Sequence, residues 1–295
     1  MDTEKSRALL KIIETGSFSQ AAEQLGYTPS GINRMAKAME KETGFPLFTR
    51  STSGVQLTRE GRSLLPLFHE LVQCQEQLDQ LCADIRGLSS GHLSIGTYYS
   101  ISSSWLPQII QRFQTNWPGI QIDLCEAGNN DLRQQLADHT IDCCFFSEYQ
   151  GQCDWIPLQR DELVVWLPKG HPLADAGCFP LESLTNSPFI QILPEQNTDL
   201  ERLLHTYQLT PDVRFTTSDN YTAYSMVAAG LGISVNNALM TKNWQGSVVT
   251  LPLNPPQYIT LGIALPSLAK ASPALNKFIA CTKIVIQSPS HTETT

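Results

Sequence analysis

The spacing of apolar residues predicts an amphipathic helix over residues 29–42. Ile32, Met35 and Met39 recur there at i, i+3 and i+7, which places their side chains on one helix face. The opposite face is polar and basic, with Ser30, Asn33, Arg34, Lys37 and Lys41. We therefore expect a helix that packs along one side and exposes a basic face along the other.

The residues before this helix have the spacing of a helix-turn-helix. Ala22 is small enough to let two helices approach, Gly26 suits a turn with positive φ, and Ile32 anchors the second helix. Thr28 is a good N-cap, and Pro29 fits the first helical position, where its missing N–H costs nothing. Such a helix can lie in a DNA major groove. The alternative is a small three-helix domain that binds protein.

A heptad pattern follows, within residues 58–88. Apolar residues alternate at spacings of four and three, with a single polar interruption at Gln75: Leu64, Phe68, Leu71, Leu78, Cys82 and Ile85. A helix with so narrow an apolar stripe needs a partner helix, so these residues are the candidate dimerisation seam. Packing on the following domain is the alternative. Residues 87–91 read as a flexible hinge.

Strand-like and helix-like segments alternate through the rest of the chain, which predicts an α/β fold with parallel sheets covered by helices. The strand candidates are residues 92–99, 120–127, 142–147, 162–168, 188–193, 213–217, 232–237 and 258–265. The helix candidates are residues 102–117, 131–139, 198–208 and 222–230.

Charge is unevenly distributed along the 295 residues. Residues 1–65 carry a net charge of +2 and residues 66–295 a net charge of −10, which suits a DNA-binding head on a body that avoids phosphate. No signal-like or membrane-spanning stretch is evident, so a cytoplasmic protein without membrane contact is expected. The eight cysteines should then be free thiols, and their spacing suggests no metal site.

The N-terminal string resembles the DNA-binding domain of the LysR-type transcriptional regulators. Its motif residues match at Gly16, Ser17, Phe18, Ala21, Ala22, Leu25, Arg34, Glu40, Gly44, Leu47, Phe48, Arg50, Val55, Leu57, Thr58 and Gly61. Later landmarks are similar too, including 171–173 and 227–233. The resemblance covers nearly the whole chain.

This resemblance implies a winged helix-turn-helix over 1–57, a dimerisation helix over 58–88 and an effector-binding domain over 89–295. The last would be a two-lobed, solute-binding-protein-like α/β domain. Its first lobe would take about 91–161 and 265–286, its second lobe about 162–264, with 287–295 as a loose tail. The implied partners are double-stranded promoter DNA, a small-molecule effector, RNA polymerase and further copies of the chain, as a homodimer or homotetramer. No cofactor is implied.

The resemblance also marks candidate contacts. For DNA these are Thr28, Pro29, Ser30, Gly31, Asn33, Arg34, Lys37, Arg50 and Ser53. For the effector they are Tyr98, Tyr99, Ser100, Ser102, Asn129, Pro194, Gln196, Asn197, Thr198 and Tyr221, with Asn220 beside them. The effector set lies where strands end and helices begin, the usual ligand position in open α/β sheets. The alternative is that these side chains only cap helices.

The chain departs from the family pattern at three places. Pro29-Ser30-Gly31 replaces the usual Gln-Pro-Ala, and proline cannot hydrogen-bond an adenine edge as glutamine does. Ser53 replaces a common wing arginine, and Asn237 stands where proline is frequent. The base preference is therefore expected to differ.

Two other functions are less consistent with the sequence. An enzyme is disfavoured because Asp142, Glu148, His139 and His171 form no recognisable nucleophile–base pattern. A thiol-based redox regulator would use Cys125, Cys143, Cys144 or Cys153. For an effector, helix N-termini and tyrosine rings suggest a small aromatic or amphipathic acid.

Overall fold

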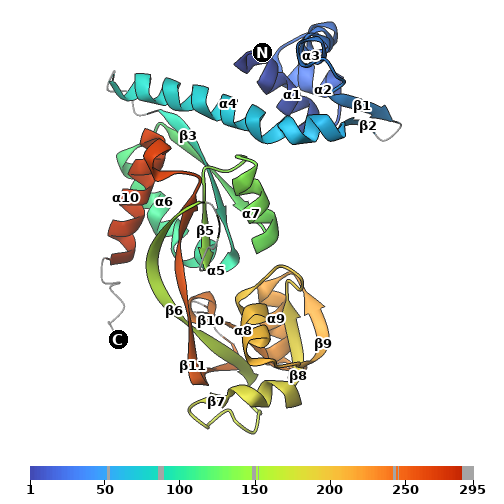
Figure 1. Cartoon of the computed structure of the whole chain (residues 1–295). Coiled ribbons are helices and arrows are strands. Elements are labelled where there is room, and N and C mark those ends of the chain that lie inside the picture. Colours follow the sequence, from blue (N-terminus) through green and yellow to red (C-terminus); the bar gives the residue numbers. More distant parts are fainter. Residues whose placement is uncertain are drawn as a thin grey trace. The chain divides into compact units, whose positions relative to one another are not determined.

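The computed structural model describes residues 1–51, 54–85, 90–147, 151, 153–241, 244 and 246–287. The chain divides into two compact units, Met1–Gly91 with Ala137–Thr140, and His92–Leu136 with Ile141–Thr295 (Figure 1). Within the described ranges, no helix combines the length and apolar content needed to cross a bilayer.

The first unit begins with three helices and a two-stranded wing. The helices are α1 (Thr3–Thr15), α2 (Phe18–Leu25) and α3 (Pro29–Thr43), and the wing strands are β1 (Phe48–Ser51) and β2 (Gly54–Leu57). Apolar side chains of all three helices meet in one core: Ala8, Ile12, Phe18, Ala21, Ala22, Ile32 and Ala36. The sequence assigned Met35 to this buried face; it is only partly buried, because Ala36 faces the core instead.

Glycine is required at Gly26 and Gly61 of this unit for different reasons. Gly26 ends α2 with φ of 70°, in the left-handed region that only glycine adopts without cost. Gly61 lies where the next helix passes the Leu47 carbonyl, and a Cβ at this position would approach that oxygen to 2.6 Å. A side chain there would force the helix away from the wing.

Helix α4 (Arg59–Ile85) follows the wing, and the Thr58 hydroxyl accepts the Gly61 N–H at 3.0 Å to cap it. The heptad prediction was partly wrong about which face of α4 is exposed to solvent. Phe68 is only 4% exposed and packs with Leu9, Met39 and Leu47, and Leu64 lies beside the same cluster. Because α1 covers this side, the exposed apolar stripe consists of Leu67, Leu71, Cys74, Leu78, Leu81 and Ile85. Cys82, also in the predicted seam, is exposed as well.

The second unit contains a mixed sheet with the strand order β10-β6-β11-β5-β3-β4. Strands β3 (Gly91–Thr97), β4 (Ile120–Glu126) and β5 (Cys143–Ser147) belong to the first lobe, and β3 and β5 are parallel. The prediction of parallel sheets holds only in part, because the long strands of this sheet pair antiparallel. Strands β6 (Asp154–Pro168) and β11 (Val248–Leu265) pair antiparallel along most of their length and continue through both lobes.

The second lobe contains β10 (Ser234–Asn237), which pairs with β6, and the parallel pair β8 (Pro188–Ile192) and β9 (Asp212–Thr217). The short strand β7 (Phe179–Pro180) pairs with β11. Leu261–Ala264 pair with β5, so the chain returns to the first lobe before residue 265, earlier than the sequence suggested. A register shift between Pro252 and Gln257 marks the irregular part of this long strand.

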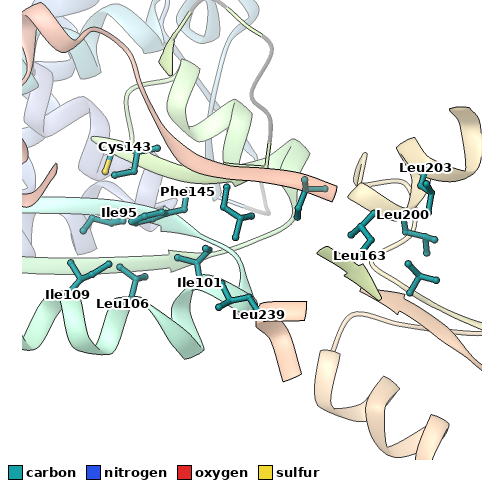
Figure 2. Packing of buried hydrophobic residues seen from close by; sticks show 14 of the residues in the cluster. Ile95, Ile101, Leu106, Ile109, Cys143, Phe145, Leu163, Leu200, Leu203 and Leu239 are labelled. Carbon is teal, nitrogen blue, oxygen red and sulfur yellow. The ribbon is translucent and has the colours of Figure 1, made fainter. Parts of the chain in front are cut away.

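In the part of the second unit that the structure describes, six helices cover the sheets. They are α5 (Tyr99–Ser104), α6 (Leu106–Asn116), α7 (Asn129–Ala137), α8 (Asp199–Tyr207), α9 (Asn220–Ala228) and α10 (Pro273–Gln287). Short 3-10 helices occupy Leu181–Asn186, Ala238–Thr241 and Leu268–Lys270. Figure 2 shows Ile95 and Phe145 of the first-lobe strands facing Leu106 and Ile109 of α6. No helix was predicted at the position of α10, although Ser272 caps this helix by accepting the Leu275 N–H at 3.1 Å.

Candidate functional site

The exposed face of α3 is basic because the two acidic residues of this helix, both near its C-terminal end, are engaged elsewhere. Glu40 accepts the backbone N–H groups of Leu47 and Phe48, at 2.9 and 3.3 Å, and so ties α3 to the wing. Glu42 pairs with Lys5, with 2.6 Å between Lys5 Nζ and Glu42 Oε1. The exposed side chains that remain on the predicted recognition face are Ser30, Arg34, Lys37 and Lys41.

The start of α3 has the predicted local chemistry. Thr28 accepts the Gly31 N–H at 3.1 Å, and Pro29 occupies the first helical turn. Asn33 is half-buried and donates to the Pro29 carbonyl at 2.9 Å, so part of its side chain serves the helix itself. These residues therefore fix where the basic face begins.

The wing brings its own candidates next to the helix-turn-helix. The Val55 N–H donates to the Gly16 carbonyl at 2.9 Å, which holds β2 against the turn after α1. Arg50 lies opposite Val55 in the strand pair. Ser53 lies outside the described residues.

A second candidate site is a cavity of about 310 Å³ between the two lobes of the second unit. Its wall combines tyrosines, apolar side chains, amides and carboxylates. The lining residues are Tyr98, Tyr99, Glu126, Ala127, Gly128, Asn129, Leu163, Ile192, Leu193, Thr198, Asp199, Leu200, Ser218, Asp219, Asn220, Val235, Asn236, Asn237 and Met240. They come from strand ends and helix starts of both lobes, as expected for a ligand site in an α/β fold.

The structure brings some of the predicted effector residues to this wall and leaves others outside it. Tyr98, Tyr99, Asn129 and Thr198 line the cavity, as does Asn220. Ser100, Ser102, Pro194, Gln196, Asn197 and Tyr221 are not part of the lining.

Local structure accounts for these differences. The chain turns into α5 at Tyr99 instead of continuing as a strand, so Ser100 is fully buried. The Ser102 hydroxyl donates to the Tyr99 carbonyl at 3.1 Å. Tyr221 is exposed and packs against Tyr224 and Trp244, with ring centroids 6.2 and 5.4 Å away.

The loop around Pro194–Thr198 serves to hold the lobes together. Asn129 Nδ2 donates to the Asn197 carbonyl at 3.0 Å, and Asn130 Nδ2 donates to the Glu195 carbonyl at 2.9 Å. Behind this loop, the Ser147 hydroxyl donates to Asp199 Oδ1 at 2.5 Å and accepts from Arg202 at 2.9 Å. Residues of the two lobes thus meet along one edge of the cavity.

Sequence reasoning missed several polar residues of the wall, notably Glu126, Asp199, Asp219 and Asn236. Glu126 is the last residue of β4, and Asn236 lies near the end of β10. The rule that ligands sit at strand ends, already used for other loops, would have indicated both. Asp219 was hidden by its role as N-cap of α9, in which it accepts the Thr222 N–H at 2.6 Å.

A half-buried carboxylate lies next to this wall. Asp161 of β6 accepts hydrogen bonds from Asn237 Nδ2 at 2.7 Å and from the Leu239 N–H at 3.1 Å. Burial raises the pKa of Asp161, although these hydrogen bonds partly oppose the shift. Asn237, where the related pattern has proline, therefore has a definite structural partner.

The cysteines proposed for redox sensing include two that are unsuited to it. Cys143 and Cys144 are fully buried in β5, and burial raises the pKa of both thiols. A thiol that stays protonated is a poor nucleophile. These two side chains act as small apolar groups of the core.

Comparison with known proteins agrees with both units. Residues 3–62 match the family described as bacterial regulatory helix-turn-helix protein, lysR family, and residues 86–285 match the LysR substrate binding domain. A curated relative is the uncharacterized HTH-type transcriptional regulator YvbU of Bacillus subtilis (strain 168). It is 28% identical over 280 residues, which cover 94% of this chain and 96% of the relative.

Two solved structures share the fold. Full-length OxyR of Pseudomonas aeruginosa has a TM-score of 0.74 and 20% identity, covering 96% of this chain and 98% of that one. Full-length CbnR, a structure with its target DNA, has a TM-score of 0.65 and 16% identity, covering 97% and 100%. The chain belongs to the LysR family of transcriptional regulators, which bind DNA and are not enzymes.

Proposed function

We propose that this regulator binds an interrupted palindrome in promoter DNA as a homodimer or homotetramer and that a small molecule in the interlobe cavity controls it. Control by a small molecule is supported by the cavity itself, which is lined by residues of both lobes. A ligand that contacts both lobes favours one lobe arrangement over others, and this preference is how binding energy becomes a conformational signal.

For DNA, the proposal places α3 in the major groove. Arg34 is the principal base contact, supported by Ser30 and Asn33, while Lys37 binds phosphate. The exposed basic face supports this assignment, because Glu40 bonds to the wing and Glu42 pairs with Lys5. Thr28, Pro29 and Gly31 set the position of the helix start, and the wing residues Arg50 and Ser53 contact the DNA backbone. Contact with RNA polymerase would follow once the promoter is bound.

The exposed apolar stripe on α4 is the proposed dimer interface. The stripe includes Leu67, Leu71, Leu78, Leu81 and Ile85, which follow one another at intervals of four, seven, three and four residues, and each is at least 38% exposed. Such a stripe is costly in water and is covered when two α4 helices pack together. Two recognition helices would then read the two halves of a palindrome.

For the response, β6 and β11 are the structural link between the lobes, because both strands continue from one lobe into the other. A ligand in the cavity would bend these two strands and alter the contacts between the loops around Asn129 and Asn197. The proposal does not require the ligand to touch DNA.

A screen tests the ligand part directly. The full chain is screened for thermal stabilisation by metabolites, and each stabilising compound is then tested for its effect on operator affinity. The double variant Asn220→Ala with Asn236→Ala should lose both responses while still binding the operator. Asn116→Ala, an exposed asparagine on α6, is the matched control. A cavity variant that responds like the unmodified chain would contradict the proposed site.

A thiol switch remains the competing proposal, restricted by burial to cysteines other than Cys143 and Cys144. Operator affinity that changes with peroxide, and with none of the stabilising compounds, would favour it.

A further inference from the structure

We infer that the interlobe cavity selects a small molecule carrying a protonated amine and disfavours an anion. The inference rests on the proposed function only in taking this cavity as a ligand site. It reverses the expectation of an acidic effector that the helix N-termini and tyrosines suggested from sequence.

The charged side chains in the described lining of the cavity are all acidic. Glu126, Asp199 and Asp219 line the cavity, whereas its described lining contains no lysine, arginine or histidine. Hydrogen bonds from Thr222 lower the pKa of Asp219, so this carboxylate is ionised at neutral pH. Arg202 pairs with Asp199 and offsets part of its charge, which leaves Glu126 and Asp219 as the main anionic groups at the wall.

Helix N-termini would favour an anion if they were uncompensated. In α9 the N-cap is Asp219, so a full negative charge already occupies the position that an anionic ligand would take. In α8 the first turn contains Asp199 and Glu201, and Glu201 accepts the Thr198 N–H at 3.0 Å. The positive ends of both helices are therefore matched by carboxylates of the chain.

An independent feature points to a ligand at the same place. Tyr98 lines the cavity, and its buried side-chain hydroxyl has no hydrogen-bond partner among the described residues. A buried hydroxyl without a partner is unfavourable, and a ligand in the cavity would satisfy it. Its oxygen can accept a hydrogen bond, which suits the N–H groups of an ammonium ion.

The remaining wall fits the rest of such a molecule. Tyr98 and Tyr99 provide aromatic rings, whose faces attract cations. Leu163, Ile192 and Met240 provide an apolar side. The volume of about 310 Å³ equals that of roughly ten water molecules at ~30 Å³ each, so the ligand is an amine with a short apolar or aromatic body.

The test compares three probes that differ in charge but little in shape: phenethylamine, phenethyl alcohol and phenylpropionate. Their affinities for the full chain are measured by calorimetry at neutral pH and millimolar probe concentration. We expect the amine to bind most tightly, the alcohol more weakly and the acid not at all.

Asp219→Asn removes a charge from the wall and keeps an N-cap, because asparagine caps helices as well as aspartate. This variant should weaken amine binding roughly two- to fivefold, the range for an exposed ion pair, and leave alcohol binding unchanged. Asp212→Asn is the control, since it removes the same charge from the exposed strand β9, away from the cavity. It should leave every probe unaffected.

Acid binding as tight as amine binding, absence of amine binding, or equal effects of the two variants would each overturn the inference. Operator affinity measured in the same samples separates this result from the proposed function. An amine that binds through Asp219 without changing operator affinity would refute the effector role alone. An acid that binds and changes operator affinity would support the effector role and overturn the charge preference.

Discussion

Replacing two leucines of the α4 stripe should dissociate the assembly. Leu71 is 38% exposed and Leu78 is 54% exposed in the single chain, which together amount to about one fully exposed leucine per helix. Burying one leucine side chain contributes about 1.5–3 kcal/mol, so a partner that covers both residues gains about 3–6 kcal/mol over two helices. Leu71→Asp with Leu78→Asp removes this gain and buries carboxylates as well.

The expected result is a dimer Kd raised by about two to four orders of magnitude, since 1.4 kcal/mol corresponds to a factor of ten. Sedimentation velocity over a concentration series measures it, and circular dichroism checks that the helices remain. Gln73→Asp with Gln77→Asp is the control, because it adds the same charge to the same helix on another face. An unchanged mass for the leucine variant, or an equal loss in the control, would refute the assignment of the stripe.

Three further outcomes are expected. Phe68→Ala should cost about 3–5 kcal/mol of unfolding free energy, because Phe68 is buried against α1 and α3; denaturant unfolding checks this, and a loss of dimer without a loss of stability would contradict it. Gly61→Ala should destabilise the chain by about 1–3 kcal/mol, because its Cβ would approach the Leu47 carbonyl; a thermal melt like that of the unmodified chain would contradict this close approach. Asp161 has a raised pKa in the folded state, so its contribution to stability is most favourable below the ordinary carboxyl pKa and declines as pH rises through the raised one. Asp161→Asn should remove that decline from the pH dependence of unfolding, and an unaltered pH profile would count against it.

Local chemistry made the helix-turn-helix predictable from sequence. Thr28, Pro29 and Gly26 act through bonds and backbone angles within a few residues of themselves, and the structure places them as expected. The face of α4 was harder to predict, because apolar residues occur on two sides of that helix. Only packing on α1 decides that Phe68 is buried and Leu67 is exposed.

In the second unit, too, contacts between residues far apart in the sequence limited what could be predicted. Strands β6 and β11 were predicted as short segments, because polar residues such as Asp161 and the prolines near 252–256 interrupt their apolar pattern. The cavity wall combines Glu126, Asp219 and Asn236, which are far apart in sequence, so no local pattern relates them. The position of the cleft could be predicted from strand ends, but its charge could not.

The measurement that tests the central claim most directly is selection of DNA by the full chain from a random duplex library. We predict enrichment of an interrupted inverted repeat, with affinity that falls steeply as salt rises because phosphate contacts dominate binding. Arg34→Ala should cost about 1–3 kcal/mol on the selected sequence and much less on random DNA, as expected for a base contact. A library that shows no enrichment, or an Arg34→Ala loss that is the same on every sequence, would contradict sequence-specific binding through this face of α3.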